Sequence, residues 1–298
     1  MSQQQVILVT GATSGIGRHA ALELATRGHL VFAAGRREPA LRSLVEEAAR
    51  AGGRIEPLVL DVTREDSIVE ARAHVLGTTD GRGIDVLVNN AGYGHVGPLE
   101  SITDDELRGQ FDTNVFGLMA MTRAFLPEMR ARGRGRIINV GSMGGRVTFP
   151  LMGAYHATKY AVEALSDALR NELAPFGIHV SLIEPGAIHT EFGDRAMDVL
   201  ERYRASRSPY AGVLARAEEV RQQFDRTAAG PEVVTNAIVH ASERRRPRAR
   251  YVVPFSTHFA LLAFRLLPTR WMDGLLRMVI GLRWGSLSAP RSAPLLNG

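Results

Sequence analysis

The residues of this sequence with the clearest potential for chemistry are Tyr155 and Lys159, which lie four positions apart. On a helix, positions i and i+4 share one face, so the phenol and the ammonium group would be neighbours. A nearby cation stabilises phenolate, and Lys159 is therefore expected to lower the pKa of Tyr155 and to form a proton-transfer pair with it. Lys159 is the only lysine in a chain whose lysines and arginines together number 36. Arginine does not lose its proton and has a different shape, so it would not replace an ammonium group here.

Three further residues near this pair in the sequence carry polar chemistry. Ser142 follows an apolar run that is predicted to be a strand, and ligands of α/β proteins bind beyond the carboxyl ends of such strands. Asn114 lies inside the helical pattern at 104–130, where an asparagine is usually only tolerated. His156 would point about 100° away from Tyr155 on a helix, which favours a structural role.

The first elements of the chain predict a phosphate-binding turn. An apolar run at 6–10 is predicted to be a buried strand and a helix is predicted at 18–27, with three glycines between them. Such a turn directs backbone N–H groups at the helix N-terminus towards phosphate, and the glycines let a diphosphate approach the backbone closely. The alternative is an ordinary glycine-containing turn. The candidate residues of the turn are Gly11, Thr13, Ser14, Gly15, Ile16 and Gly17.

The end of the second predicted strand, at 30–34, indicates which dinucleotide would bind. An acidic residue in this place contacts the adenosine ribose of NAD, whereas arginine accommodates the 2′-phosphate of NADP. Positions 34–37 hold no acidic residue and include Arg36 and Arg37. We therefore predict NADP as the preferred cofactor, with NAD as the second candidate. The alternative for the arginines is a surface pair in an arginine-rich chain.

The rest of the chain alternates strand and helix patterns, which predicts a parallel sheet. The predicted fold class is α/β: a single Rossmann-type, doubly wound parallel sheet flanked by helices, with a helical C-terminal extension. Asp61 and Val62 follow one strand as a candidate contact for the adenine edge, and Asn89 and Asn90 follow the next, where amides would hold neighbouring strands or the cofactor. The other predicted strands are 57–60, 84–88, 135–140, 178–183 and 251–253, and the other predicted helices are about 38–51, 65–77, 104–130, 155–173 and 231–243.

The composition narrows the classes of function. The chain has no cysteine, which excludes disulfides and cysteine-based catalysis, and no histidine spacing of a metal site occurs, so no metal is predicted. The start of the chain contains too short an apolar run for a signal peptide, so a cytoplasmic protein is expected. The net charge is +5, but residues 243–298 hold ten arginines against two acidic residues. The arginine run at 244–250 lacks an aromatic platform and is predicted to be solvated, with no nucleic-acid partner.

The motifs, taken together and in order, resemble the classical short-chain dehydrogenase/reductase family. The resemblance covers about residues 5–253, and its specificity comes from the ordered set rather than from any single motif. Two loops, at 92–100 and 175–192, are similar to those of the 17β-hydroxysteroid and retinol dehydrogenase branch. The motifs are Thr10-Gly-x-x-x-Gly15-x-Gly17, Asn89-Asn-Ala-Gly92, Asn114, Ser142, Tyr155-x-x-x-Lys159 and Pro185-Gly186.

The resemblance implies a role for each candidate residue. Tyr155 would exchange a proton with the substrate oxygen while hydride moves to or from the nicotinamide, and Ser142 would hold that oxygen. Lys159 would also bind the nicotinamide ribose, and Asn114 would anchor a water molecule in a proton relay from Lys159. Asn90, followed by Ala91 and Gly92, would contact the adenosine-side ribose. The nicotinamide end would be held by Pro185, Gly186, Ile188 and Thr190.

The implied activity is that of an NADP(H)-preferring oxidoreductase, which interconverts a hydrophobic alcohol and its ketone or aldehyde. Such a substrate would be steroid-like, retinoid-like or otherwise lipid-like. It would bind under a lid formed by residues at about 190–230. The resemblance also implies that the protein is a homodimer or homotetramer. The opposed interpretations are a non-catalytic dinucleotide-binding regulator and a membrane-associated scaffold on the same fold. The candidate substrate residues are Ser142, Tyr155, Tyr93, Val96, Phe149, Met152, His189 and Phe192, of which the apolar ones also suit a protein core.

The last 45 residues extend beyond the usual end of this family. We predict a Rossmann-fold domain at 1–253 and an amphipathic helical extension at 254–298. Arginines and a proline interrupt the apolar pattern at 258–282, which therefore lacks the unbroken run of a spanning helix. The pattern suits helices that lie on a membrane interface. It equally suits a cover over the substrate pocket or a dimer contact, and packed helices are favoured over peripheral membrane contact.

Overall fold

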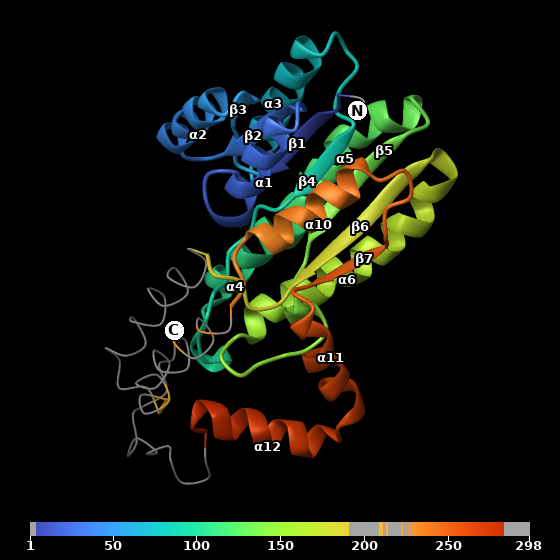
Figure 1. Ribbon diagram of the computed structural model, residues 1–298. Helices are drawn as coiled ribbons and strands as arrows, with labels where there is room; N and C mark the ends of the chain where they lie inside the picture. Colours follow the sequence, from blue (N-terminus) through green and yellow to red (C-terminus); the bar gives the residue numbers. More distant parts are fainter. Residues whose placement is uncertain are drawn as a thin grey trace.

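The computed structural model of the chain describes residues 4–190, 209–210, 213, 222, 226 and 228–282. This part contains a seven-stranded parallel sheet with the order β3-β2-β1-β4-β5-β6-β7 (Figure 1). The chain leaves β1 towards β2 and β3 and then returns to β4 on the other side of β1, which creates a switch point where ligands bind in open α/β sheets. The strands are β1 (Val6–Thr10), β2 (Leu30–Gly35), β3 (Arg54–Val59), β4 (Val86–Asn89), β5 (Gly135–Val140), β6 (Ile178–Pro185) and β7 (Arg250–Val253).

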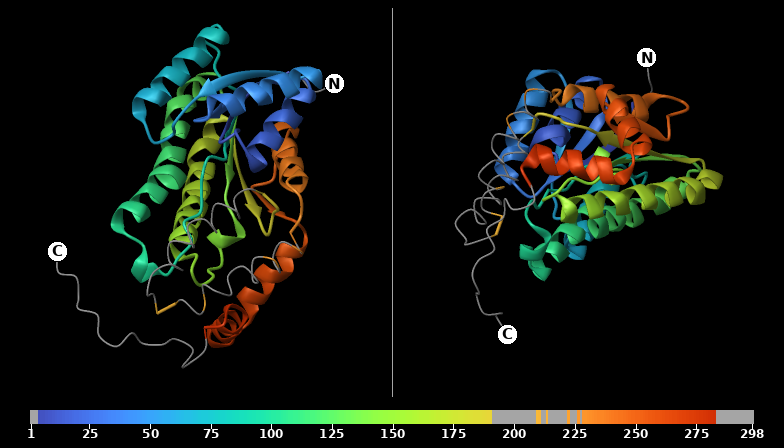
Figure 2. Two further views of the ribbon diagram at one scale, coloured as in Figure 1. Left: turned by 90° about the vertical axis from the view of Figure 1, so that its left-hand side faces the viewer. Right: turned by 90° about the horizontal axis from the view of Figure 1, so that it is seen from below.

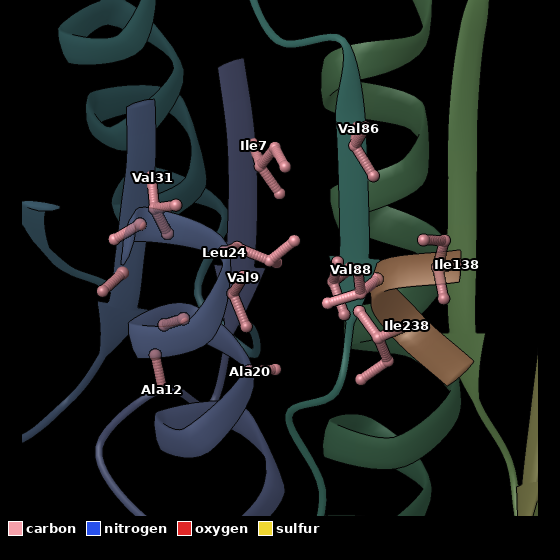
Figure 3. Close-up of a cluster of buried hydrophobic side chains, with 14 of the residues drawn as sticks. Ile7, Val9, Ala12, Ala20, Leu24, Val31, Val86, Val88, Ile138 and Ile238 are labelled. Atoms are coloured by element: carbon pink, nitrogen blue, oxygen red, sulfur yellow. The ribbon is translucent and has the colours of Figure 1, made fainter. Parts of the chain in front are cut away.

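Helices cover both faces of the sheet (Figures 1 and 2). Successive residues of a strand point to opposite faces, so β1 contributes Ile7 and Val9 to one core and Val6 and Leu8 to the other. Figure 3 shows the first core, where the strands pack on α1 and α10. One face is covered by α1 (Gly15–Thr26), α2 (Glu38–Arg50) and α10 (Glu232–Glu243), and the other by α3 (Glu65–Thr78), α5 (Leu118–Ala131) and α6 (Gly153–Leu173).

The fold class predicted from the sequence is confirmed, and the differences lie in element boundaries. The predicted strand at 57–60 begins earlier, as β3 at Arg54, because alternate residues of this edge strand are exposed and its apolar pattern is interrupted. The predicted helix at 104–130 is divided: α4 (Asp104–Phe111) is followed by a π-helical turn (Asp112–Gly117) before α5. Turns of this kind are frequent at functional sites.

The C-terminal part of the described chain forms two helices beyond β7, α11 (Ser256–Leu266) and α12 (Thr269–Ile280). They lie past the carboxyl end of the sheet, and α12 turns sharply away from α11 (Figure 1). Among the described helices, none combines the length and the apolar character needed to cross a bilayer. The division of the chain at 253 and 254 stays a prediction, and most of the predicted lid at 190–230 falls outside the described residues.

Candidate active site

One cavity of about 1380 Å³ collects most of the predicted site residues at the carboxyl ends of β1, β4, β5 and β6. Pockets for a single small ligand usually measure about 300–1,000 Å³, so this volume accommodates a dinucleotide and a second molecule together. Every predicted cofactor, catalytic and substrate residue lines the cavity except Gly17, Asn114, His189 and Phe192. Phe192 lies outside the described residues.

His189 is not brought into the cavity, contrary to its prediction as a substrate contact. Ile188 forms a parallel β-bridge with Ala229, and the His189 amide donates to the Ala229 carbonyl at 2.8 Å. Because alternate residues of an extended chain point to opposite sides, Ile188 lines the cavity while His189 is exposed.

The glycine-rich turn has the backbone geometry of a phosphate cradle. Gly11 and Gly15 have φ of +67° and +53°, which only glycine adopts without strain. Gly17 lies on α1 against the turn, where a β-carbon would come within 2.4 Å of the Gly11 carbonyl oxygen and of the Asn90 side-chain nitrogen. With the N-terminus of α1 at this turn, the residues fit the diphosphate of a dinucleotide.

Gly17→Ala is expected to lower the free energy of unfolding by about 1–3 kcal/mol, because the new methyl group overlaps backbone atoms that cannot move cheaply. Gly77→Ala is the matched control: it also lies in a helix, a methyl group there would have no other atom within 4 Å, and it is expected to be stabilising by about 0.5–1 kcal/mol. Urea unfolding of both variants measures the difference. Equal stability of the two variants would contradict the tight packing of this turn.

Asn89, the last residue of β4, and Asn90 join that strand to its neighbours, which is one of the two roles predicted for them. The Asn89 amide donates to the Asn139 side-chain oxygen on β5 at 3.0 Å. The Asn90 amide donates to the Thr10 carbonyl on β1 at 3.0 Å. The Thr10 hydroxyl in turn accepts from the backbone N–H groups of Asn90 and Ala91, at 2.9 and 3.0 Å. Thr10 thus fixes the cradle to β4. In the sequence, only its position directly before the glycines indicates this role.

Tyr155, Lys159 and Ser142 meet at the end of β5, as the sequence predicts. Tyr155 and Lys159 lie on α6 and are 8% and 7% exposed. The Ser142 oxygen accepts the backbone N–H of Gly144 at 3.0 Å, and its side chain is hydrogen-bonded to that of Tyr155. Since the Gly144 N–H uses an acceptor site of Ser142, the serine hydroxyl can donate its own proton towards the phenol oxygen.

The electrostatics of the pair differ from the expectation that Lys159 lowers the pKa of Tyr155. Burial raises the pKa of Tyr155 to about 12, and the hydrogen bond from Ser142 offsets only part of this effect. Burial also lowers the pKa of Lys159 to about 8. The Lys159 ammonium donates to the Val140 carbonyl at 2.9 Å and lies 5.7 Å from the centre of the Tyr155 ring. Loss of solvent is therefore the main influence on the pKa of both groups.

Asn114 holds the cavity wall together instead of lining it. Its side-chain N–H groups donate to the Tyr93 carbonyl at 2.9 Å and to the Thr158 hydroxyl at 3.0 Å, and its oxygen accepts the Tyr93 N–H at 3.0 Å. Thr158 also donates to the Tyr155 carbonyl at 2.7 Å. Asn114 therefore connects the loop after β4 to the helix that carries Tyr155 and Lys159. Its role in anchoring a water molecule stays a prediction.

His156 fixes the loop that follows Ser142. Its Nδ1 accepts the backbone N–H of Phe149 at 3.2 Å, and the two rings pack edge to face with centres 5.6 Å apart. Burial lowers the pKa of His156 to about 4, so the ring is neutral at physiological pH and accepts that hydrogen bond.

The outer part of the cavity is apolar, and the C-terminal helices build much of it. Phe149 packs edge to face on Phe264 of α11, with ring centres 5.7 Å apart. Met272 and Leu276 of α12 also line the cavity. The structure thus supports the pocket-cover alternative for the C-terminal extension. The sequence does not single out these residues, because the same apolar pattern suits a core, a membrane face or a pocket.

The two predicted NADP arginines have different surroundings. The Arg37 guanidinium donates to the Thr13 carbonyl at 3.0 Å and so braces the glycine-rich turn. Arg36 lines the cavity, is 75% exposed and lies 3.9 Å from the carboxylate of Asp61. Burial raises the pKa of Asp61, but hydrogen bonds from Thr63 and the charge of Arg36 outweigh it and leave the pKa below its ordinary value. Arg36 is the better placed of the two to meet a ligand phosphate.

The described residues contain no group of three or more His, Cys, Asp or Glu side chains that could hold a metal ion.

Comparison with known proteins agrees with this geometry. A family model described as short chain dehydrogenase matches residues 5–199. The chain belongs to the short-chain dehydrogenase/reductase family. Enzymes of this family are oxidoreductases that act on CH–OH groups, bind NAD or NADP and are commonly oligomeric. The resemblance inferred from the ordered motifs is therefore confirmed.

Similar proteins cover most of the chain. Human 17-beta-hydroxysteroid dehydrogenase type 1 is 39% identical over 257 residues, which span 83% of this chain and 76% of that protein. The 3-ketodihydrosphingosine reductase of Bacteroides thetaiotaomicron is 35% identical over 282 residues, spanning 94% of this chain and 100% of that protein. The crystal structure of a short-chain dehydrogenase from Streptomyces avermitilis has a TM-score of 0.73 and 34% identity, covering 95% of this chain and 99% of that one.

Proposed function

We propose that this chain is an NADP(H)-preferring oxidoreductase that interconverts a lipophilic alcohol and its ketone or aldehyde. The observation that carries the proposal is the single cavity that joins the phosphate cradle, the Ser142–Tyr155 pair and an apolar wall that includes Phe264 and Met272. The two similar enzymes named above take their names from a hydroxysteroid and from 3-ketodihydrosphingosine, and both names favour a lipid-like substrate.

The proton chemistry follows from the burial of the site. Bound NADP(H) would supply the hydride chemistry. With a pKa of about 12, Tyr155 keeps its proton at neutral pH and can donate it to the substrate oxygen as negative charge develops there. The Ser142 hydroxyl would hold the same oxygen and orient it. Lys159, placed by the Val140 carbonyl, would stabilise the phenolate that remains.

Arg36→Ala is expected to reduce the preference for NADPH over NADH by about 10-fold to 100-fold, the effect of losing a charge-assisted hydrogen bond to phosphate. The preference is measured as the ratio of kcat/KM for the two cofactors. Arg42→Ala is the control, because Arg42 is also exposed and pairs with Glu38 on α2 at 3.2 Å. A preference unchanged by Arg36→Ala would count against an arginine-bound 2′-phosphate.

The substrate class is tested with a series of ketones that differ only in alkyl chain length. If the apolar wall binds the chain, kcat/KM with NADPH should rise by about fourfold for each added CH₂ until the cavity is full. Each ketone is assayed at a concentration below its solubility limit. A preference for small, polar carbonyl compounds would contradict the lipophilic assignment.

A further inference from the structure

The C-terminal helices α11 and α12 present a second apolar face, on the side away from the cavity. Cavity-lining residues such as Phe264 and Met272 occupy one side of each helix. The outward side chains recur at spacings of three and four residues, as expected for one stripe along a helix. They are Phe259, Leu262 and Leu266 along α11 with Phe255 just before it, and Trp271 and Met278 along α12, while Leu275 lies at the border with the cavity.

This outer face is unusually exposed for an apolar surface. Phe255 is 73% exposed, and Leu266 and Trp271 are each 70% exposed. Nine of the sixteen exposed large apolar residues in the described part of the chain fall within residues 255–279. Single exposed apolar residues are normal on a protein surface, but a contiguous group of this kind marks an interaction site.

The polar residues of the same helices are mainly cationic. Arg265, Arg270 and Arg277 are all exposed, and none of the three pairs with an acidic side chain among the residues that the structure describes. Residues 254–282 contain only one acidic residue, Asp273. Three arginines against one aspartate give this segment a net charge of +2.

We propose that the outer face of α11 and α12 docks on the anionic surface of a lipid bilayer. An apolar stripe beside exposed arginines suits a helix that lies in the interface, where apolar side chains enter the acyl region and cations meet anionic headgroups. A second copy of the chain fits less well, because a symmetric contact would place the same arginines of both copies near one another. The bilayer is therefore the occupant that matches both the apolar area and the charge.

The same helices connect this face to the cavity. Leu275 and Val279 are each 48% exposed, and both also line the cavity. A lipophilic molecule dissolved in the bilayer would therefore meet the cavity wall at α12 without crossing water. This entry route rests on the proposed function, whereas docking of the helices does not.

Docking is tested with the full chain and vesicles of phosphatidylcholine, with or without phosphatidylglycerol. The chain should float with the vesicles that contain phosphatidylglycerol. Phe259→Glu combined with Trp271→Glu should reduce the partition coefficient at least about tenfold, and replacement of the three arginines by glutamine should do so as well. Val69→Glu is the control, because Val69 is 60% exposed on α3 and should leave flotation unchanged.

A spectroscopic readout places the contact on α12. The chain has two tryptophans, at 271 and 284, so Trp284→Phe leaves Trp271 as the only reporter. Its emission should shift to the blue on addition of anionic vesicles. Absence of flotation, equal flotation of the Phe259→Glu/Trp271→Glu variant, or an unshifted Trp271 emission would overturn the proposal. A dimer contact on this face would also overturn the proposal. Light scattering would then show a dimeric wild type and a monomeric double variant, and neither would bind vesicles.

The entry route is tested separately from docking. The Phe259→Glu/Trp271→Glu variant should turn over a short, water-soluble ketone at the wild-type rate, since neither side chain lines the cavity. With a long-chain ketone dissolved in anionic vesicles, its rate should fall at least about tenfold, in proportion to the lost partitioning. Equal rates on the vesicle-borne ketone would overturn the route. Vesicle binding without turnover of any carbonyl compound would leave docking intact and refute the proposed function instead.

Discussion

Tyr155→Phe is expected to lower kcat/KM by about 10³-fold or more, because it removes the hydroxyl proposed to give a proton to the substrate oxygen while leaving the ring in its packing site. The phenol is 8% exposed and hydrogen-bonded to Ser142, so water cannot readily take its place. Cofactor binding should change little, which titration of NADPH fluorescence would measure.

Tyr160→Phe is the matched control for this substitution. Tyr160 lies on the same helix but is 44% exposed, and its loss should leave kcat/KM unchanged. If both variants retained full turnover, the assignment of Tyr155 as the proton donor would be wrong.

Lys159→Arg is expected to lower kcat/KM by about 100-fold or more, although it keeps the positive charge. The ammonium is 7% exposed and donates to the Val140 carbonyl at 2.9 Å. A planar guanidinium is larger and directs its N–H groups differently, so it cannot occupy this buried position without displacing its neighbours. Circular dichroism and thermal unfolding would separate a local effect on the rate from a loss of folding.

The pH dependence distinguishes the chemistry of Lys159 from its shape. Burial lowers the pKa of this lysine to about 8, so the ammonium form is present below that pH and is lost as the pH rises through it. In the reductive direction, kcat/KM of the wild type should therefore decline above about pH 8. The residual activity of Lys159→Arg should lack this decline, because a guanidinium keeps its proton. The same decline in the variant would assign it to another group.

Most of the fold follows from local sequence patterns. The apolar runs that form β1, β5 and β6 are buried on both faces, which makes them recognisable without knowledge of the rest of the chain. Edge strand β3 begins at Arg54, earlier than predicted, because its exposed residues break the apolar run. The π-helical turn at Asp112–Gly117 has no signature in the helical pattern, which predicts one continuous helix there.

The sequence predicts the parts of the site in which a particular backbone position requires a particular residue type. It predicts less well the properties that depend on how much solvent reaches a side chain. The glycine turn and the Ser142, Tyr155 and Lys159 cluster follow from motif and order. The sequence predicts a pKa of Tyr155 below its ordinary value, whereas the pKa lies above it, because burial depends on packing by distant parts of the chain. His189 turns outward through its β-bridge neighbour, and the apolar walls of α11 and α12 depend on tertiary contacts that a single sequence does not specify.

The most direct test of the proposed activity follows the hydrogen that is transferred. Purified chain is mixed with NADPH deuterated at the transferring position of the nicotinamide C4 and with a long-chain ketone, and the product is identified by mass spectrometry. We expect an alcohol that carries deuterium on the carbinol carbon, formed in step with NADPH consumption, and Tyr155→Phe should nearly abolish its formation. If the folded chain bound NADPH but transferred no deuterium to any ketone or aldehyde, it would instead be a non-catalytic dinucleotide-binding protein, and the proposed function would be contradicted.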